Sequence, residues 1–190
     1  MTITSSGIKI QKYSPNLGAV ITGVDLSKEI NEDQFKDIHK AFLDNQVLFF
    51  QNQNEILPEI HLKLGKLFGE LHVHPAAPSM PGYPEIFEIH AHKNSKVANG
   101  EFWHSDVSCD IEPPLGTMLQ LHILPETGGD TMFSDMYSAY NELSDKYKSL
   151  VNGLVAIHES EHLYSGRYED RGVNRDNIKT PVANHPLIRT

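Results

Sequence analysis

Two segments in the first third of the chain carry apolar residues at helical spacing. Asn31 is followed three positions later by Gln34, and in this arrangement each side chain can cap the other residue's backbone N–H at a helix start. The apolar positions that follow fall on one helical face: Phe35, Ile38, Phe42 and Leu43. The pattern ends near Asn45, so we predict an amphipathic helix that begins after Asn31 and stops there.

The second helical segment begins at Pro58, a residue favoured in the first turn, and ends before Gly69. Its apolar face consists of Ile60, Leu64, Leu67 and Phe68. A third, shorter helix is predicted from Asp145 to about Asn152, with Ser144 as its N-cap.

Short apolar or alternating runs predict strands. The run from Gln46 to Phe50 is apolar and favours a buried strand. Further strands are predicted, mostly from alternating patterns, over residues 85–89, 117–122, 131–133 and 154–158. Early helices followed by short strands indicate an α+β fold with an antiparallel sandwich or barrel as its core.

The composition of the chain limits the number of domains and the kinds of partner that we expect. The 190 residues fit one domain of ordinary hydrophobic (39%) and charged (22%) content. A net charge of -9 argues against a nucleic-acid partner, which requires clustered Lys and Arg. No apolar run is long enough for a membrane span, and residues 1–6 carry no secretory pattern. The single cysteine, Cys109, excludes an internal disulfide and favours a reducing cytoplasm.

The most informative chemistry is the stretch Phe102–Asp106. His104 and Asp106 are two positions apart, so in an extended strand their side chains would leave the same face. An imidazole and a carboxylate so placed suit a non-heme Fe(II) site of the two-His-one-carboxylate type. By itself this pair is a weak signal, since a polar strand face carries the same residues.

The stretches of sequence around this pair strengthen the prediction of a metal site. In chain order they are Gly18–Leu26, Gln46–Gln51, Phe68–Pro75, Trp103–Ser108, Pro113–Thr117, Leu124–Thr131 and His185–Thr190. Together they resemble the taurine dioxygenase family of Fe(II)- and 2-oxoglutarate-dependent oxygenases, which includes the 2,4-dichlorophenoxyacetate dioxygenases. The resemblance spans essentially the whole chain. It implies an α+β fold with a double-stranded β-helix (jelly-roll) core and flanking helices.

The resemblance also implies roles for particular residues. His104 and Asp106 match the first two iron ligands, and no catalytic residue is expected beyond the metal ligands. Thr131 matches a threonine that contacts a carboxylate of 2-oxoglutarate, although β propensity alone also explains a threonine there. His74 matches a histidine that contacts the substrate's anionic group as a cation or a donor, although a plain loop histidine is an equal alternative. Val107 matches a position that lines the substrate pocket.

Two features depart from the family pattern. The third iron ligand and a 2-oxoglutarate-binding arginine are expected beyond Thr190, so we expect residues 1–190 to be the N-terminal portion of one longer oxygenase domain that lacks its C-terminal part. We assign none of the later histidines to iron: His158, His162 and His185. In addition, Ala77 stands where the taurine enzyme has a tyrosine, which predicts a roomier substrate pocket.

The implied activity is hydroxylation of a small anionic organic substrate with Fe(II), 2-oxoglutarate and O2, and succinate and CO2 as co-products. The substrate would be taurine or a longer alkyl sulfonate, an alkyl sulfate, or an aryloxy or carboxylic acid. One alternative is a catalytically incomplete small-molecule-binding protein on the same fold. Another is a zinc hydrolase that uses His104, Asp106 and a further histidine. Turnover of 2-oxoglutarate distinguishes these functions, and the sequence leaves open whether the protein forms a homo-oligomer.

Overall fold

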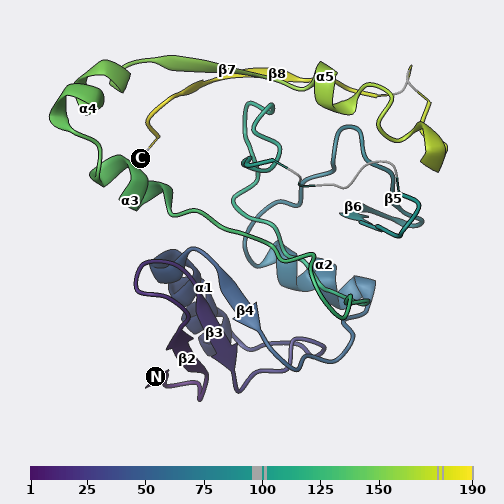
Figure 1. Ribbon diagram of the computed structural model, residues 1–190. Coiled ribbons are helices and arrows are strands. Elements are labelled where there is room, and N and C mark those ends of the chain that lie inside the picture. The colour runs from purple at the N-terminus through teal and green to yellow at the C-terminus, as the bar shows by residue number, and fades with distance from the viewer. Residues whose placement is uncertain (96–99, 101, 175, 177, 190) are drawn as a thin grey trace. The chain divides into compact units, whose positions relative to one another are not determined.

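The structure is a computed structural model that describes residues 1–95, 100, 102–174, 176 and 178–189 (Figure 1). The chain forms two compact units, each built from two stretches of sequence. Unit 1 comprises Met1–Glu70 and Met118–Lys148, and unit 2 comprises Leu71–Thr117 and Ser149–Thr190. Each unit is described separately below.

Unit 1 contains a four-stranded sheet in the order β1 (Thr2–Ile3), β2 (Lys9–Lys12), β3 (Ala19–Thr22) and β4 (Leu48–Phe50). The first two pairs are antiparallel, whereas β3 and β4 are parallel, with Ala19 opposite Leu48. A parallel pair needs a long crossover, and helix α1 (Glu32–Asn45) supplies it. The strand predicted at residues 46–50 is therefore confirmed as β4.

The predicted helices of unit 1 are also confirmed. The side-chain oxygen of Asn31 accepts a hydrogen bond from the backbone N–H of Gln34 at 2.9 Å. The side-chain oxygen of Gln34 accepts one from the backbone N–H of Asn31 at 3.0 Å, which completes the capping box at the start of α1. Helix α2 (Pro58–Lys66) begins with proline as expected.

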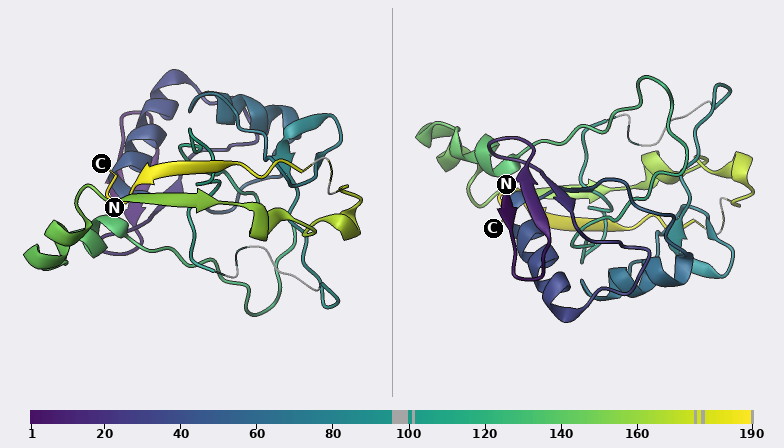
Figure 2. Two further views of the ribbon diagram at one scale, coloured as in Figure 1. Left: turned by 90° about the horizontal axis from the view of Figure 1, so that it is seen from above. Right: turned by 90° about the horizontal axis from the view of Figure 1, so that it is seen from below.

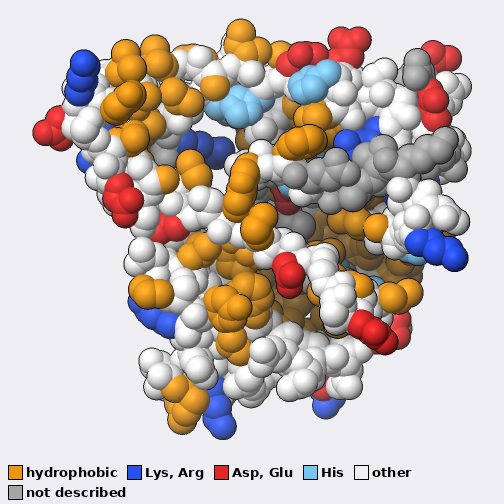
Figure 3. Space-filling model, in the orientation of Figure 1, with side chains coloured by type: hydrophobic (Ala, Val, Ile, Leu, Met, Phe, Trp, Pro, Cys, Tyr) orange, Lys and Arg blue, Asp and Glu red, His pale blue; other side chains and the backbone are white. Residues whose placement is uncertain are grey.

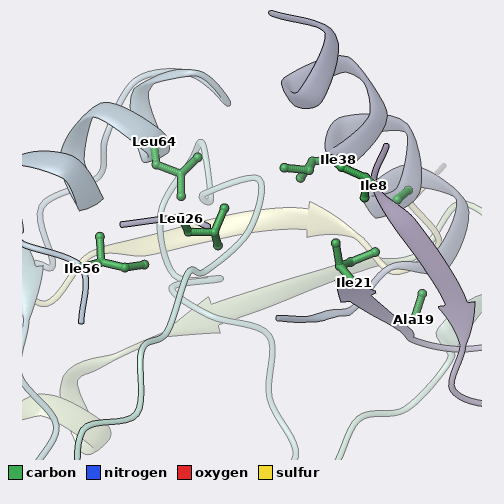
Figure 4. Packing of buried hydrophobic residues seen from close by; sticks show 8 residues of the cluster. Ile8, Ala19, Ile21, Leu26, Ile38, Ile56 and Leu64 are labelled. Atoms are coloured by element: carbon green, nitrogen blue, oxygen red, sulfur yellow. The ribbon is translucent and has the colours of Figure 1, made fainter. Parts of the chain in front are cut away.

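The hydrophobic core of unit 1 lies between the sheet and both helices. Figure 4 shows side chains from each of these elements pointing toward one another. The buried cluster consists of Ile8, Ala19, Ile21, Leu26, Ile38, Ala41, Ile56 and Leu64. Complete burial of a side chain such as Ile21 contributes roughly 1.5–3 kcal/mol by the hydrophobic effect.

The second stretch of unit 1 contains little regular structure before helix α3 (Met136–Asn141), which is capped by Asp135. Helix α4 (Asp145–Val151) follows and confirms the third predicted helix. The strands predicted over residues 117–122 and 131–133 are wrong, because neither segment is extended against a neighbouring strand. Alternation and β propensity stabilise a strand only where a pairing partner is available.

Unit 2 contains two antiparallel ribbons. The first pairs β5 (Ser79–Met80) with β6 (Tyr83–Phe87), and the second pairs β7 (Val155–Glu159) with β8 (Val182–Pro186). Both views of Figure 2 show β7 and β8 side by side along their length. Helix α5 (Glu161–Tyr164) and the short 3₁₀ turn η1 (Glu169–Arg171) connect them. The strands predicted at residues 85–89 and 154–158 are confirmed as β6 and β7, each shifted slightly along the chain.

The β7–β8 ribbon has two faces. One face is exposed and carries apolar side chains, and the other face is partly buried. Val155, Ile157 and Val182 are exposed, whereas Ala183 is buried on the opposite face. Figure 3 shows hydrophobic side chains gathered at the surface near the end of the ribbon where α4 leads into β7. The alternating burial along β7 agrees with the strand predicted there, whereas β8 was not predicted from the sequence.

The α+β class is confirmed, with helices and sheets in the same chain. Within the described residues the strands form three separate sheets, so the complete jelly roll stays a prediction. No helix in the described part of the chain is long and apolar enough to cross a membrane.

A glycine at the end of β3 provides a test of this fold. Gly23 and Gly7 both have a φ of +86°, but a Cβ at Gly23 would lie 2.9 Å from the carbonyl oxygen of Gly7, whereas a Cβ at Gly7 would meet nothing within 4 Å. Gly7→Ala should cost about 1–2 kcal/mol for the left-handed backbone alone. Gly23→Ala should cost about 1–3 kcal/mol more, because the backbone must move. Urea denaturation followed by circular dichroism measures both, and equal losses would contradict this close approach.

Candidate metal centre

His104 and Asp106 lie together in unit 2. The Nε2 atom of His104 is 3.2 Å from Oδ1 of Asp106. Metal bonds to imidazole nitrogen and carboxylate oxygen are about 2.0–2.2 Å long, so two donors at neighbouring coordination positions lie about 3 Å apart. Both side chains are about half exposed, at 54% and 49%. The separation of the pair therefore matches that of two ligands of one divalent ion.

The local structure that brings these side chains together differs from the expected strand. Residues 103–105 belong to neither helix nor strand, and residues 106–109 form a turn. Val107 has a φ of 48°, in the left-handed region that a β-branched residue rarely adopts. The predicted strand is therefore wrong, because the chain turns at Asp106 and no neighbouring strand pairs with it. The two side chains meet through the turn instead of through strand alternation.

The outer atoms of both side chains are also held. The Nδ1 atom of His104 lies 2.6 Å from the backbone carbonyl of Phe102. A carbonyl only accepts hydrogen bonds, so Nδ1 carries a proton, and Nε2 is the nitrogen that faces Asp106. The hydroxyl of Thr117 donates to Oδ2 of Asp106 at 2.5 Å. Hydrogen bonds of this kind orient ligands in metal sites.

The turn that follows the pair is tied to three histidines. The Nδ1 atom of His158 lies 2.9 Å from the hydroxyl of Ser108, and Nε2 of His72 lies 2.5 Å from a carboxylate oxygen of Asp110. Nε2 of His185 donates to the backbone carbonyl of Asp110 at 2.9 Å. Strands β7 and β8 are thereby linked to the turn. Neither His158 nor His185 was assigned to iron from the sequence, and here both form hydrogen bonds to the turn.

His74 is held as a neutral hydrogen-bond donor. Its Nδ1 atom accepts hydrogen bonds from the backbone N–H groups of Ala76 at 3.1 Å and Ala77 at 2.9 Å, so the proton lies on Nε2. Burial, and secondarily the neighbouring His72, lowers the pKa of His74, although nearby carboxylates oppose the shift. Of the two forms that the sequence allowed, the structure favours the donor over the cation.

Aromatic rings surround His74 in spite of the alanine at position 77. The His74 ring lies 5.4 Å from Phe87 and 5.2 Å from Tyr164, measured between centroids. The hydroxyl of Tyr164 is 3.8 Å from Sγ of the buried Cys109. Burial raises the pKa of the Tyr164 phenol, with a further contribution from Cys109, so this hydroxyl stays protonated.

The other two predicted site residues belong to different units. Val107 is half-buried in the turn beside Asp106, and its place in a substrate pocket stays a prediction. Thr131 belongs to unit 1, where it is exposed and lies in a segment without helix or strand. Among the described residues, no group of three or more His, Cys, Asp or Glu side chains is placed to hold one metal ion.

Similar proteins are known. The chain is 35% identical to an alkylsulfatase of Acinetobacter baylyi, over 84% of this chain and 49% of that protein. It is 28% identical to an alpha-ketoglutarate-dependent sulfonate dioxygenase of Saccharomyces cerevisiae, over 96% of this chain and 46% of that protein. A crystal structure of a taurine dioxygenase from Burkholderia xenovorans matches with a TM-score of 0.70 and 27% identity, over 96% of this chain and 58% of that one.

The chain thus spans about half the length of the curated relatives it matches. The family described as "Taurine catabolism dioxygenase TauD, TfdA family" matches residues 9–190. This match includes the pair His104 and Asp106, the turn that holds it, and the segment that carries Thr131. The chain belongs to the TauD/TfdA family of taurine catabolism dioxygenases.

Proposed function

We propose that this protein is an Fe(II)- and 2-oxoglutarate-dependent dioxygenase that hydroxylates a small anionic organic substrate. The observation that carries the proposal is the 3.2 Å approach of His104 Nε2 to Asp106 Oδ1, with the outer atom of each side chain held by a hydrogen bond. An imidazole and a carboxylate are the donors that non-heme Fe(II) oxygenases use, with other positions left open.

His104 and Asp106 would hold Fe(II), and they are the two ligands that this proposal names. When bound, iron with 2-oxoglutarate supplies oxygen activation coupled to decarboxylation of 2-oxoglutarate to succinate and CO2. The protein contributes ligand geometry, orientation of the substrate and exclusion of water. Thr131 would donate its hydroxyl to a carboxylate of 2-oxoglutarate.

The substrate would carry a sulfonate, a sulfate or a carboxylate. Relatives named as an alkylsulfatase and as a sulfonate dioxygenase support this class. The net charge of -9 opposes long-range attraction of an anion, so recognition would rest on local donors. His74 is such a donor, because its Nδ1 atom is occupied and its Nε2–H is left to reach the substrate. Hydroxylation at the carbon next to sulfur or oxygen would give an unstable product that fragments.

The compartment would be a reducing one such as the cytoplasm, since Cys109 is a buried free thiol. Release of succinate separates this proposal from a catalytically incomplete binding protein, which would bind ligand without turnover.

The first prediction concerns metal binding. His104→Ala and Asp106→Ala each remove a ligand and should weaken Fe(II) binding. Loss of a residue that only hydrogen-bonds to a ligand weakens metal binding about 10- to 100-fold, and loss of the ligand itself should weaken it more. Anaerobic titration with Fe(II) and 2-oxoglutarate should show a weak visible charge-transfer band that both variants lose. His162→Ala is the matched control, because His162 is an exposed histidine of the same unit, 66% accessible and near Glu159. Retention of the band and of succinate release by both site variants would overturn the assignment.

The second prediction concerns 2-oxoglutarate. Thr131→Val keeps the shape of the side chain and removes its hydroxyl. Loss of one hydrogen bond to a carboxylate should cost roughly 1.5–3 kcal/mol, or about tenfold or more in affinity. The Michaelis constant for 2-oxoglutarate measures this loss. Thr127→Val, in the same exposed segment, should leave the constant unchanged. Equal constants for Thr131→Val and the unmodified protein would argue against the role.

The third prediction concerns the substrate. Succinate release should be stimulated more by longer alkyl sulfonates, alkyl sulfates or aryloxy acids than by taurine, because Ala77 leaves room that a tyrosine would fill. His74→Ala should raise the Michaelis constant of the preferred substrate, whereas His74→Gln, whose amide can donate from a similar position, should retain part of the affinity.

Two results would contradict this account of the substrate site. Taurine as the clear best substrate would rule out the roomier pocket. An unchanged Michaelis constant in His74→Ala would rule out the contact between His74 and the anion.

A further inference from the structure

No role in the site was assigned to Thr117 from the sequence, yet its side chain contacts the candidate metal centre. It follows Asp106 by eleven positions, and the intervening chain bends at residues 110–112 and at Leu115. Its hydroxyl lies 2.5 Å from Oδ2 of Asp106, at the short end of the range for a hydroxyl donating to an ionised carboxylate. A hydroxyl–carboxylate bond of this length restrains rotation of the carboxylate.

We propose that Thr117 is a positioning residue that restricts Asp106 to ligation through one oxygen. This inference rests on the proposed function, because it concerns the geometry of the same metal site. The carboxylate of Asp106 has two oxygens with different partners. Oδ1 lies 3.2 Å from His104 Nε2, and Oδ2 accepts the hydrogen bond from Thr117. Metal therefore reaches Oδ1 beside the imidazole, while Oδ2 stays occupied.

One-oxygen ligation matters because carboxylates can also bind a metal through both oxygens. A second bond from Asp106 would occupy a coordination position that a two-His-one-carboxylate site leaves open for its substrates. The restraint is needed here because Asp106 is 49% exposed and lies in a turn, so packing alone does not hold its carboxylate. His104 has its own restraint, since its Nδ1 atom donates to the carbonyl of Phe102. The hydrogen bond from Thr117 thus orients Asp106, as the hydrogen bond to the backbone carbonyl of Phe102 orients His104.

The experiment measures binding of Mn(II) alone, by the electron paramagnetic resonance signal of the free ion, and needs no turnover. Thr117→Val removes the hydroxyl and keeps the branched shape, so Mn(II) should bind about 10- to 100-fold more weakly, as for other outer partners of metal ligands. Thr117→Ser restores the hydroxyl without the methyl group and should bind within about threefold of the unmodified protein. Thr180→Val is the matched control, because Thr180 is an exposed threonine of the same unit.

The results separate this inference from the proposed function. Weak binding by Thr117→Val, with recovery in Thr117→Ser and unchanged thermal unfolding in both, supports the positioning role. If Asp106→Ala abolishes Mn(II) binding while Thr117→Val binds normally, the metal site stands and the role of Thr117 is overturned. A serine variant as weak as the valine variant also overturns it, because shape and not the hydroxyl then matters. Mn(II) binding that is unaffected by Asp106→Ala overturns both proposals.

Discussion

The turn from Asp106 to Asp110 is the constraint on which unit 2 depends. Four side chains from separate parts of the unit form hydrogen bonds with this turn. Thr117 contacts Asp106, His158 contacts Ser108, and His72 and His185 contact Asp110. Each of these contacts satisfies a polar group and also ties a loop or strand to the turn. One of these contacts, from Thr117, orients a candidate iron ligand, and the others hold the turn that follows it.

Histidines near this turn serve different purposes, and their hydrogen-bond partners distinguish them. His104 donates from Nδ1 to a backbone carbonyl, which leaves Nε2 available to a metal. His74 accepts at Nδ1 from two backbone N–H groups, which leaves Nε2–H available to an anion. His185 uses Nε2 for a structural bond to the carbonyl of Asp110. Residue type alone indicates none of these roles, because the backbone partner decides which nitrogen carries the proton.

Local sequence patterns predicted the elements whose stability is local. The capping box of Asn31 and Gln34 and the proline at position 58 marked two helices correctly, because caps act within a single turn. Of the β7–β8 ribbon, the sequence predicted β7 from its alternating pattern, whereas β8 was not predicted. The segments around Thr117 and Thr131 have the composition of strands and are not strands, because pairing depends on a partner elsewhere in the chain.

For the site, the sequence by itself indicated which residues are candidates for the chemistry: the pair His104 and Asp106, with His74 as a candidate contact for an anion. Only the tertiary structure decided how they are arranged. The pair meets in a turn with a left-handed Val107, and Thr117 reaches Asp106 from eleven positions away. The physical reason is that residue type fixes what a group can bind, whereas its orientation and protonated atom depend on hydrogen bonds to partners that sequence spacing does not reveal.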